Sequence, residues 1–317
     1  MPKYDKALLA QQARALDFPP HTFEKVARLT EVLRFLNETP ELREALALKG
    51  GTAINLTMFR LPRLSVDIDL DFALNLPREE MLARRERVTA LLGRFMAAEG
   101  YSERDKSKRS HSLDSTVYAY TNAAGNLDNI KVEINYSLRC HVLPTVEAAD
   151  DTTGAFAAFP IRTLAPVEIF ASKIVALAGR AAARDLYDLN NMIVFNLFEP
   201  AELDLLRRCA VFYLAIAGEA GAQALDFQRL DSITPRKIKT DLYPVIRGTE
   251  RFDFAVAKQR VGAFLVEHMV PAPQEAEFLR RFAAGQYAPE LLFDDAEIAA
   301  RVKEHPMALW RIQQTRK

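Results

Sequence analysis

Cysteine is scarce in this sequence: Cys140 and Cys209 are the only two among 317 residues, and they form no Cys-x-x-Cys motif. Two isolated cysteines exclude a disulfide framework and a structural zinc cluster, and they suit a reducing cytosol. Histidine is scarce as well, and the five histidines show no metal-ligand spacing. A metal-dependent phosphohydrolase that uses acidic residues alone is one possible class of enzyme for this chain. The absence of a histidine-rich metal site weakens that interpretation.

Net charge and long apolar runs are also missing. Lysine plus arginine and aspartate plus glutamate each number 42, so bulk charge argues neither for nor against a polyanionic partner. A nucleic-acid site would therefore be a local patch. No apolar run approaches a membrane span, and the N-terminal stretch MPKYDKALLAQQARALDFPP has no signal-peptide core. We expect a cytoplasmic protein with no membrane partner.

Hydrophobic patterns divide the chain into two parts and predict an α+β fold. Strand patterns occur up to about Pro160 and then stop, and the stretches that follow have helical periodicity. We expect an α/β domain with N-terminal helices at 1–160 and a helical domain at 161–317. In the first part, the expected helices are 21–38 (with Thr22 as N-cap), 39–46 and 77–100, and the expected strands are 46–49, 65–72 and an antiparallel pair, 115–122 with 129–137.

The stretch SVDIDLDF predicts a strand with one acidic face. Its apolar residues alternate with Ser65, Asp67, Asp69 and Asp71, so the carboxylates share a face. Hard oxygen ligands on a rigid strand suit Mg²⁺, with Mn²⁺ as an alternative. Glu133, on the polar face of another expected strand, is a candidate third carboxylate for a two-metal clamp. The competing interpretation is a solvated acidic face, and we take Asp71 to be a bystander at the strand end.

The sequence KGGT lies a short distance before this acidic strand. Its two glycines predict a tight turn from a strand into a helix, where close backbone approach and helix N–H groups can receive a phosphate. Thr52 adds a hydroxyl, and the nearby cations Lys49, Arg60 and Arg63 are candidates to neutralise a triphosphate. A Gly-Gly pair alone is usually only a turn, but its short distance in sequence from the three aspartates favours a phosphate-binding site.

A second set of charged residues occurs more than a hundred residues later. A continuous helix would place four of them within roughly 80° of one another: Lys173, Arg180, Arg184 and Asp188. Asp185 would then point elsewhere. If Gly179 breaks the helix, two short helices must bring the groups together. A cationic stripe suits a triphosphate; the alternative is a solvated row of ion pairs such as Arg184 with Asp188.

Four motifs, taken in order, resemble the AbiEii/AbiGii-type toxin nucleotidyltransferases: KGGTAINL, RLSVDIDLDF, KVEINYS and ASKIVALAGRAAARDLYDLNN. This family is a branch of the DNA polymerase β-like nucleotidyltransferase superfamily found in bacterial toxin–antitoxin systems. The resemblance runs from Lys49 to about Asn191. It implies a nucleotidyltransferase-type mixed β-sheet with flanking helices, followed by a helical domain that contributes Lys173 and Asp188 to the site.

The resemblance also implies roles for individual residues. Gly51-Thr52 stands where the family has Gly-Ser, and Asp67 and Asp69 match its Asp-x-Asp pair. The superfamily usually has a third carboxylate on a neighbouring strand, and Glu133 is the candidate for it here, but this branch of the family varies at that position. The implied catalytic residues are Asp67, Asp69, Lys173, Asp188 and Ser65; the implied nucleotide-binding residues are Gly50, Gly51, Thr52, Lys49, Arg184 and Arg180; and the implied metal ligands are Asp67, Asp69 and Glu133.

As a function, the resemblance implies a toxin that uses Mg²⁺ to transfer a nucleoside monophosphate from a nucleoside triphosphate (NTP). The expected acceptor is the 3′ end of tRNA, which would block translation, and a cognate antitoxin is an expected partner. Basic candidates for RNA contact are Arg104, Lys106, Lys108 and Arg109, and Arg236, Lys237 and Lys239. The alternatives are nucleotidyl or phosphoryl transfer to a protein hydroxyl, and a non-catalytic interaction module.

Overall fold

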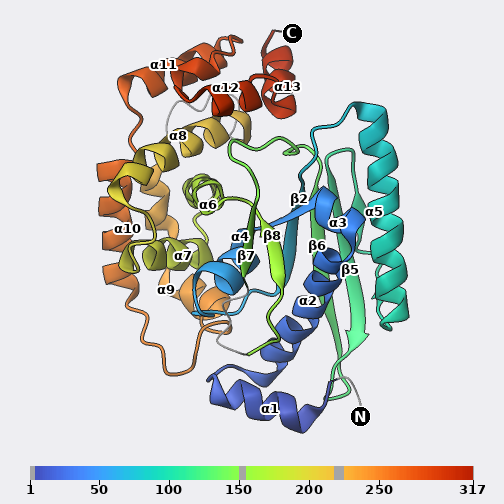
Figure 1. Cartoon of the computed structure of the whole chain (residues 1–317). Helices are drawn as coiled ribbons and strands as arrows, with labels where there is room; N and C mark the ends of the chain where they lie inside the picture. The colour runs from blue at the N-terminus through green and yellow to red at the C-terminus, as the bar shows by residue number, and fades with distance from the viewer. Residues whose placement is uncertain (1–3, 150–154, 218–224, 317) are drawn as a thin grey trace. The chain divides into compact units, whose positions relative to one another are not determined.

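The acidic strand is β2 (Asp67–Phe72), an inner strand of a mixed sheet (Figure 1). The structure is a computed structural model that describes residues 4–149, 155–217 and 225–316. In this described part, eight strands form one sheet in the order β3-β5-β6-β2-β1-β8-β7, with β4 paired to β5. The other strands are β1 (Leu46–Lys49), β3 (Ser102–Glu103), β4 (Lys108–Arg109), β5 (Leu113–Thr121), β6 (Leu127–Asn135), β7 (Val146–Ala149) and β8 (Pro160–Thr163).

Strand β2 has an antiparallel neighbour on one side and a parallel neighbour on the other. In the pairing with β1, Lys49 lies opposite Asp69. In the pairing with β6, Lys131 lies opposite Asp67, and Glu133 lies opposite Asp69. Since paired residues point to the same face of a sheet, these five charged side chains share one face. The expected antiparallel pairing of β5 with β6 is confirmed.

The opposite face of β2 is apolar and is covered by helices. Ile68 and Leu70 are buried there, as the alternation predicts. Helices α2 (Pro20–Glu38) and α5 (Arg78–Ala98) lie beside the sheet (Figure 1), and the rings of Phe35 and Phe95 stack between them with centroids 3.9 Å apart. Burial of these apolar groups fixes which face of β2 turns inward. The acids are therefore directed to the other side.

Two details of the expected secondary structure are wrong. Helix α2 begins at Pro20 with Pro19 as N-cap, not at Thr22, because proline fits the first turn of a helix without losing a hydrogen bond. The sequence patterns also missed two strands near Pro160: β8 pairs in parallel with β1 through Thr163 and Leu48, and β7 pairs with β8. Both of these strands have four residues, too few for alternation to reveal them.

The chain divides into two compact units. The sheet unit consists of Met1–Arg139, Thr145–Leu164 and Pro244–Glu250, and the helical unit consists of Cys140–Pro144, Ala165–Tyr243 and Arg251–Lys317. The expected division into domains at 1–160 and 161–317 stays a prediction. Neither of the two short exchanged segments, 140–144 and 244–250, has a signal in the sequence.

The returning segment Pro244–Glu250 holds the loop that leads into β2. The N–H of Leu64 donates to the carbonyl of Val245 at 2.7 Å, and Arg63 forms a β-bridge with Ile246. At the other end of the segment, the N–H of Gly248 donates to the carbonyl of Asp17 at 2.9 Å. The segment thus fixes the backbone just before the acidic strand.

The helical unit is built around α6 (Pro166–Arg180), as the sequence predicts. Glu168 in its first turn is buried and accepts hydrogen bonds from the N–H of Val142, from the N–H of Leu143 and from the hydroxyl of Tyr213. Burial alone would raise the pKa of Glu168, but these partners and His141 lower it below its ordinary value. A charged Glu168 therefore fixes the orientation of α6.

Further helices of the helical unit complete its core. Across the described residues, none of the helices in the chain has the combined length and apolar character needed to cross a membrane. The α-helices that accompany α6 are α7 (Ala183–Val194), α8 (Pro200–Ala217), α9 (Pro235–Lys237), α10 (Phe254–His268), α11 (Pro273–Ala283), α12 (Ala296–Lys303) and α13 (Pro306–Thr315).

Candidate active site

The glycine turn has the geometry that the sequence predicts. Strand β1 ends at Lys49, and a single helical turn, α4 (Gly50–Ala53), begins at the next residue. Gly50 has φ +68°, a conformation that side chains disfavour, and a Cβ at Gly50 would lie 2.7 Å from Oδ2 of Asp69. A Cβ at Gly51 would lie 2.6 Å from a guanidinium nitrogen of Arg63. The backbone conformation at Gly50 therefore favours glycine, and a side chain at Gly51 would have to displace the guanidinium group of Arg63.

Thr52 and Ser65 have different surroundings. The Thr52 side chain is fully buried, and its hydroxyl donates to the backbone carbonyl of Asp67, so it fixes the turn against β2. Ser65 is half-buried, and its hydroxyl oxygen lies 3.0 Å from the position that a Cβ of Gly51 would take. The hydroxyl of Ser65 therefore lies beside Gly51 in a half-buried position, whereas the hydroxyl of Thr52 is used to hold the turn against β2.

Asp71 is not a solvated bystander. Its side chain is 2% exposed and forms an ion pair with the ammonium of Lys49. Asp67 and Asp69, two and four residues earlier on the same face, are half-exposed. A solvated position for Asp71 was wrong, because the strand is covered at its far end, where only a paired charge is tolerated; that Asp71 is a bystander to the reaction stays a prediction. Of the three aspartates on this face, Asp71 is buried and ion-paired, whereas Asp67 and Asp69 are half-exposed.

Asp67 and Asp69 fit a divalent cation. Their carboxylates are hard oxygen donors on a rigid inner strand, which is the ligand type that Mg²⁺ and Mn²⁺ take. Gly50 keeps the space beside Asp69 clear of a side chain. These two residues would hold the ion.

Glu133 and Lys131 form an ion pair on β6, beside these two aspartates. Their charged atoms are 2.9 Å apart, and their side chains are 26% and 37% exposed. Partial burial would lower the pKa of Lys131, but the carboxylates of Glu133, Asp67 and Asp69 together raise it. Among the residues that the structure describes, no three acids, histidines or cysteines are arranged to hold a metal ion. In this structure Glu133 is thus paired with Lys131 and is not one of three ligands arranged around a metal position.

In the helical unit, the motif with Lys173 and Asp188 spans two helices. Helix α6 ends at Arg180, and Ala181 adopts the left-handed conformation with φ 47° and ψ 56° before α7 begins at Ala183. The break therefore comes after Gly179, at an alanine that the sequence does not mark. Two short helices bring the charged groups together, the second of the two arrangements that the sequence allowed.

Lys173 lies between two aspartates. Its ammonium is 2.9 Å from Oδ1 of Asp185 and 3.0 Å from Oδ2 of Asp188, and all three side chains are buried. Burial would raise the pKa of Asp185, but Lys173 and Arg180 lower it to about 2. The expectation that Asp185 points elsewhere was wrong, because it assumed a continuous helix. Asp185 belongs to the cluster, and sequence spacing alone had no signal for it.

The two arginines of this motif are more accessible. Arg180 donates to Asp185 through its Nε at 2.8 Å, yet its side chain is 65% exposed. Arg184, in the first turn of α7, is half-exposed. The motif therefore combines a buried ammonium with guanidinium groups that solvent can reach.

Comparison with known proteins identifies the family. The family model described as nucleotidyl transferase AbiEii toxin, type IV TA system, matches residues 34–286. The chain belongs to the AbiEii nucleotidyltransferase toxin family. This confirms the resemblance of the four motifs, and the chain is accordingly a nucleotidyltransferase of a type IV toxin–antitoxin family. No curated protein gives a significant match.

A solved structure supports the same fold for this AbiEii-family chain. MenT4, a nucleotidyltransferase toxin from Mycobacterium tuberculosis H37Rv, aligns with a TM-score of 0.62 at 19% sequence identity. The alignment covers 96% of this chain and 98% of MenT4. At this identity the likeness concerns the fold, and it confirms the predicted mixed sheet with flanking helices and a helical C-terminal part.

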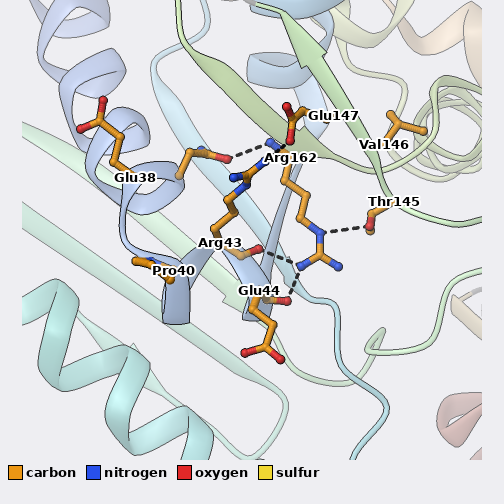
Figure 2. A pocket seen from close by; sticks show the side chains of 9 residues that line it. Glu38, Pro40, Arg43, Glu44, Thr145, Val146, Glu147 and Arg162 are labelled. Atoms are coloured by element: carbon orange, nitrogen blue, oxygen red, sulfur yellow. Dashed lines mark hydrogen bonds and ion pairs between the residues drawn. The ribbon is translucent and has the colours of Figure 1, made fainter.

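A cavity of about 460 Å³ occurs elsewhere in the sheet unit of this AbiEii-family chain (Figure 2). Arg162 donates to the carbonyl of Arg43 at 2.8 Å and to the hydroxyl of Thr145 at 3.0 Å, and Arg43 forms an ion pair with Glu147. These charged groups stabilise the end of α3 (Pro40–Ala45) and each other. None of the β2 acids lines the cavity, so it is not the candidate active site.

Proposed function

We propose that this AbiEii-family enzyme transfers a nucleoside monophosphate from an NTP to the 3′ end of tRNA, with Mg²⁺ as its metal. The observation that carries the proposal is the position of Asp69 beside Gly50, where a Cβ would lie 2.7 Å from the carboxylate. This brings a glycine turn suited to phosphate and an acid suited to a metal into direct contact. A decayed, non-catalytic module would have no need to retain this arrangement.

In this proposal, Asp67 and Asp69 would hold the metal, which would supply positive charge next to the α-phosphate. The glycine turn lets phosphate oxygens approach the backbone of Gly50 and Gly51. Ser65 offers its hydroxyl beside the same turn. Lys49 stays paired with Asp71 and provides positive charge at the base of the turn.

The helical unit contributes a positioned cation. We assign Lys173 to the triphosphate, with Asp185 and Asp188 fixing its ammonium so that it does not have to reorganise during transfer. Arg180 and Arg184 provide further positive charge for the leaving pyrophosphate.

The acceptor is proposed to bind through a basic segment of the helical unit. Arg236, Lys237 and Lys239 lie on α9 and the π-helical turn η3 (Ile238–Leu242), and Arg236 and Lys239 are exposed. Tyr243 follows directly and is 50% exposed, so an aromatic ring for base stacking accompanies the cations. In the other candidate segment, Arg109 is paired with Glu103, which favours the first.

Labelled nucleotides test the reaction. The purified chain is incubated with α- or γ-labelled NTP in the presence of total tRNA and of lysate proteins. The proposal predicts that the α label enters tRNA and that the γ label leaves as pyrophosphate. Label in protein, or transfer of the γ label, would favour the alternative acceptor or phosphoryl transfer. The type IV family also makes a cognate antitoxin a proposed partner, to be tested by co-expression.

A further inference from the structure

We propose that Arg63 is a positioning residue of the transfer reaction: its buried guanidinium group holds the glycine turn, and the segment Pro244–Glu250 holds Arg63 in turn. The inference rests on the proposed function, because the glycine turn is where that function places the phosphates of the NTP. It gives Arg63 a role inside the protein, in place of the direct neutralisation of a triphosphate that the sequence suggests.

The guanidinium group of Arg63 packs against the glycine turn. Its Nη2 lies 2.6 Å from the position that a Cβ of Gly51 would take, and the hydroxyl oxygen of Ser65 lies 3.0 Å from the same position. Its Nη1 donates to the carbonyl of Leu64 at 3.0 Å. A planar group with several donors in a fixed geometry is suited to hold a backbone in one place. Arg63 therefore lies where the glycine turn, the Ser65 hydroxyl and the loop before β2 meet.

Arg63 is almost closed to solvent, with only 2% of its surface exposed. An arginine stays protonated in proteins, so a positive charge is fixed beside the turn. To meet a triphosphate directly, the guanidinium group would have to leave Gly51 and its hydrogen bond to Leu64. A positioning role keeps both contacts, and the fixed charge still favours an anion at the backbone of the turn.

The segment Pro244–Glu250 holds the loop that carries Arg63. Its Arg247 donates through Nη2 to the carbonyl of Arg60 at 3.3 Å and to the carbonyl of Leu61 at 3.2 Å. Leu61 has φ +50°, a conformation that residues other than glycine rarely adopt and that the surrounding structure must support. The position of Arg63 thus depends on a segment that lies far away in the sequence.

Arg28 on α2 provides a matched control, because it is a buried arginine in a different setting of the same unit. It is 7% exposed and forms an ion pair with Glu24 at 2.8 Å. Its guanidinium carbon lies 3.8 Å and 4.2 Å from the ring centroids of Tyr4 and Tyr120. None of these three partners belongs to the glycine turn or to the loop before β2. Replacing Arg28 should therefore lower stability without disturbing the turn.

Binding of inorganic triphosphate with Mg²⁺ to the full chain, measured by isothermal titration calorimetry, tests the inference without an acceptor. Arg63→Met should weaken binding by about tenfold or more, because a fixed charge and its hydrogen bond are lost. Arg63→Lys keeps the charge but not the planar geometry and should weaken binding by a similar factor. Arg28→Met should stay within about twofold of the wild type, even though it unfolds at lower urea concentration.

Three results would overturn the inference. Wild-type affinity in Arg63→Met would exclude any role in phosphate binding, and recovery of affinity in Arg63→Lys would show that the charge alone acts. An equal loss in Arg28→Met would show that lower stability is the cause. If the Arg63 variants do not fold, Arg247→Met decides: it should weaken binding by about threefold or more through the loss of two hydrogen bonds, and wild-type affinity would overturn the inference.

The double variant Asp67→Asn/Asp69→Asn separates this inference from the proposed function. It should abolish triphosphate binding, because the metal that accompanies the phosphates loses its ligands. If it does so while the Arg63 variants bind normally, the inference alone fails. If the double variant binds like the wild type, or if the wild type itself does not bind, the phosphates are not held at this turn, and the proposed site fails together with the inference.

Discussion

Lys173 and Asp188 form a buried ion pair across the joint between α6 and α7, with 3.0 Å between the ammonium and a carboxylate oxygen. Asp185 contacts the same ammonium at 2.9 Å. The joint at Ala181 makes this possible, because it lets α7 turn its first two aspartates toward α6. One lysine is thereby held in a single orientation by two carboxylates.

Replacing Lys173 should affect both activity and stability. Lys173→Met is expected to reduce nucleotide transfer by more than about 100-fold, in line with the loss of a preorganised charge. It should also lower the free energy of unfolding by about 3–5 kcal/mol, because two buried carboxylates lose the ammonium group between them. Transfer is measured with α-labelled NTP, and stability by urea unfolding.

The double variant Lys173→Met/Asp185→Asn is the control for that prediction. It removes the charge of one of the two carboxylates that contact Lys173 and should recover part of the lost stability, while transfer stays as low as in Lys173→Met. Recovery of transfer along with stability would show that Lys173 has a structural role alone.

Asp185 should make stability depend on pH. Its pKa is lowered to about 2 from an ordinary value of 3.8, so the charged carboxylate stabilises the folded state above pH 4. That stabilisation, about 2 kcal/mol for this shift, is lost as the pH falls from about 4 toward 2. The free energies of unfolding of wild type and Asp185→Asn should therefore differ most at neutral pH and converge in acid. A difference that stays constant from pH 7 to pH 2 would contradict the assignment.

Gly50→Ala should disrupt the metal and phosphate region. The new Cβ would lie 2.7 Å from Asp69, and φ +68° is strained for alanine. We expect at least a tenfold loss of transfer and weaker Mn²⁺ binding. Gly93→Ala in α5 is the matched control: no atom lies within 4 Å of its Cβ position, so it should keep full activity and gain about 0.5–1 kcal/mol of stability. Normal transfer by Gly50→Ala would contradict the close approach.

Charge reversal in the basic segment should weaken tRNA binding. Arg236→Glu/Lys237→Glu/Lys239→Glu is expected to raise the Kd for tRNA and to flatten its salt dependence, because fewer phosphate contacts release fewer counterions. The comparison is Arg104→Glu/Lys106→Glu/Lys108→Glu, which reverses the same number of charges in the other basic segment. An equal effect of the two triple variants would indicate bulk charge rather than a site.

Local patterns in the sequence were sufficient for much of the sheet unit. Alternation over Asp67–Phe72 predicts the acidic face, and the glycines predict the strand-to-helix turn, because both depend on a few consecutive residues. The burial of Asp71 could not be predicted, since it depends on what covers the end of the strand. The same holds for Pro244–Glu250, whose contacts join residues far apart in the chain.

In the candidate site too, contacts that depend on the folded structure could not be predicted from local sequence patterns. Asp67 and Asp69 share a face by alternation, but the ion pair of Glu133 with Lys131 depends on side-chain orientation as well as on the strand. Asp185 was misjudged because a single left-handed alanine, Ala181, redirects the second helix. Nothing in the sequence around Ala181 distinguishes it from its alanine neighbours.

Sequencing of RNA 3′ ends after expression of the chain in a bacterial host tests the central claim most directly. Wild-type protein should arrest growth and leave untemplated nucleotides on tRNA 3′ ends, and Asp67→Asn, expressed to the same level, should do neither. Growth arrest by the wild type with unchanged tRNA ends would contradict the proposed acceptor, and modified ends with Asp67→Asn would contradict the proposed site.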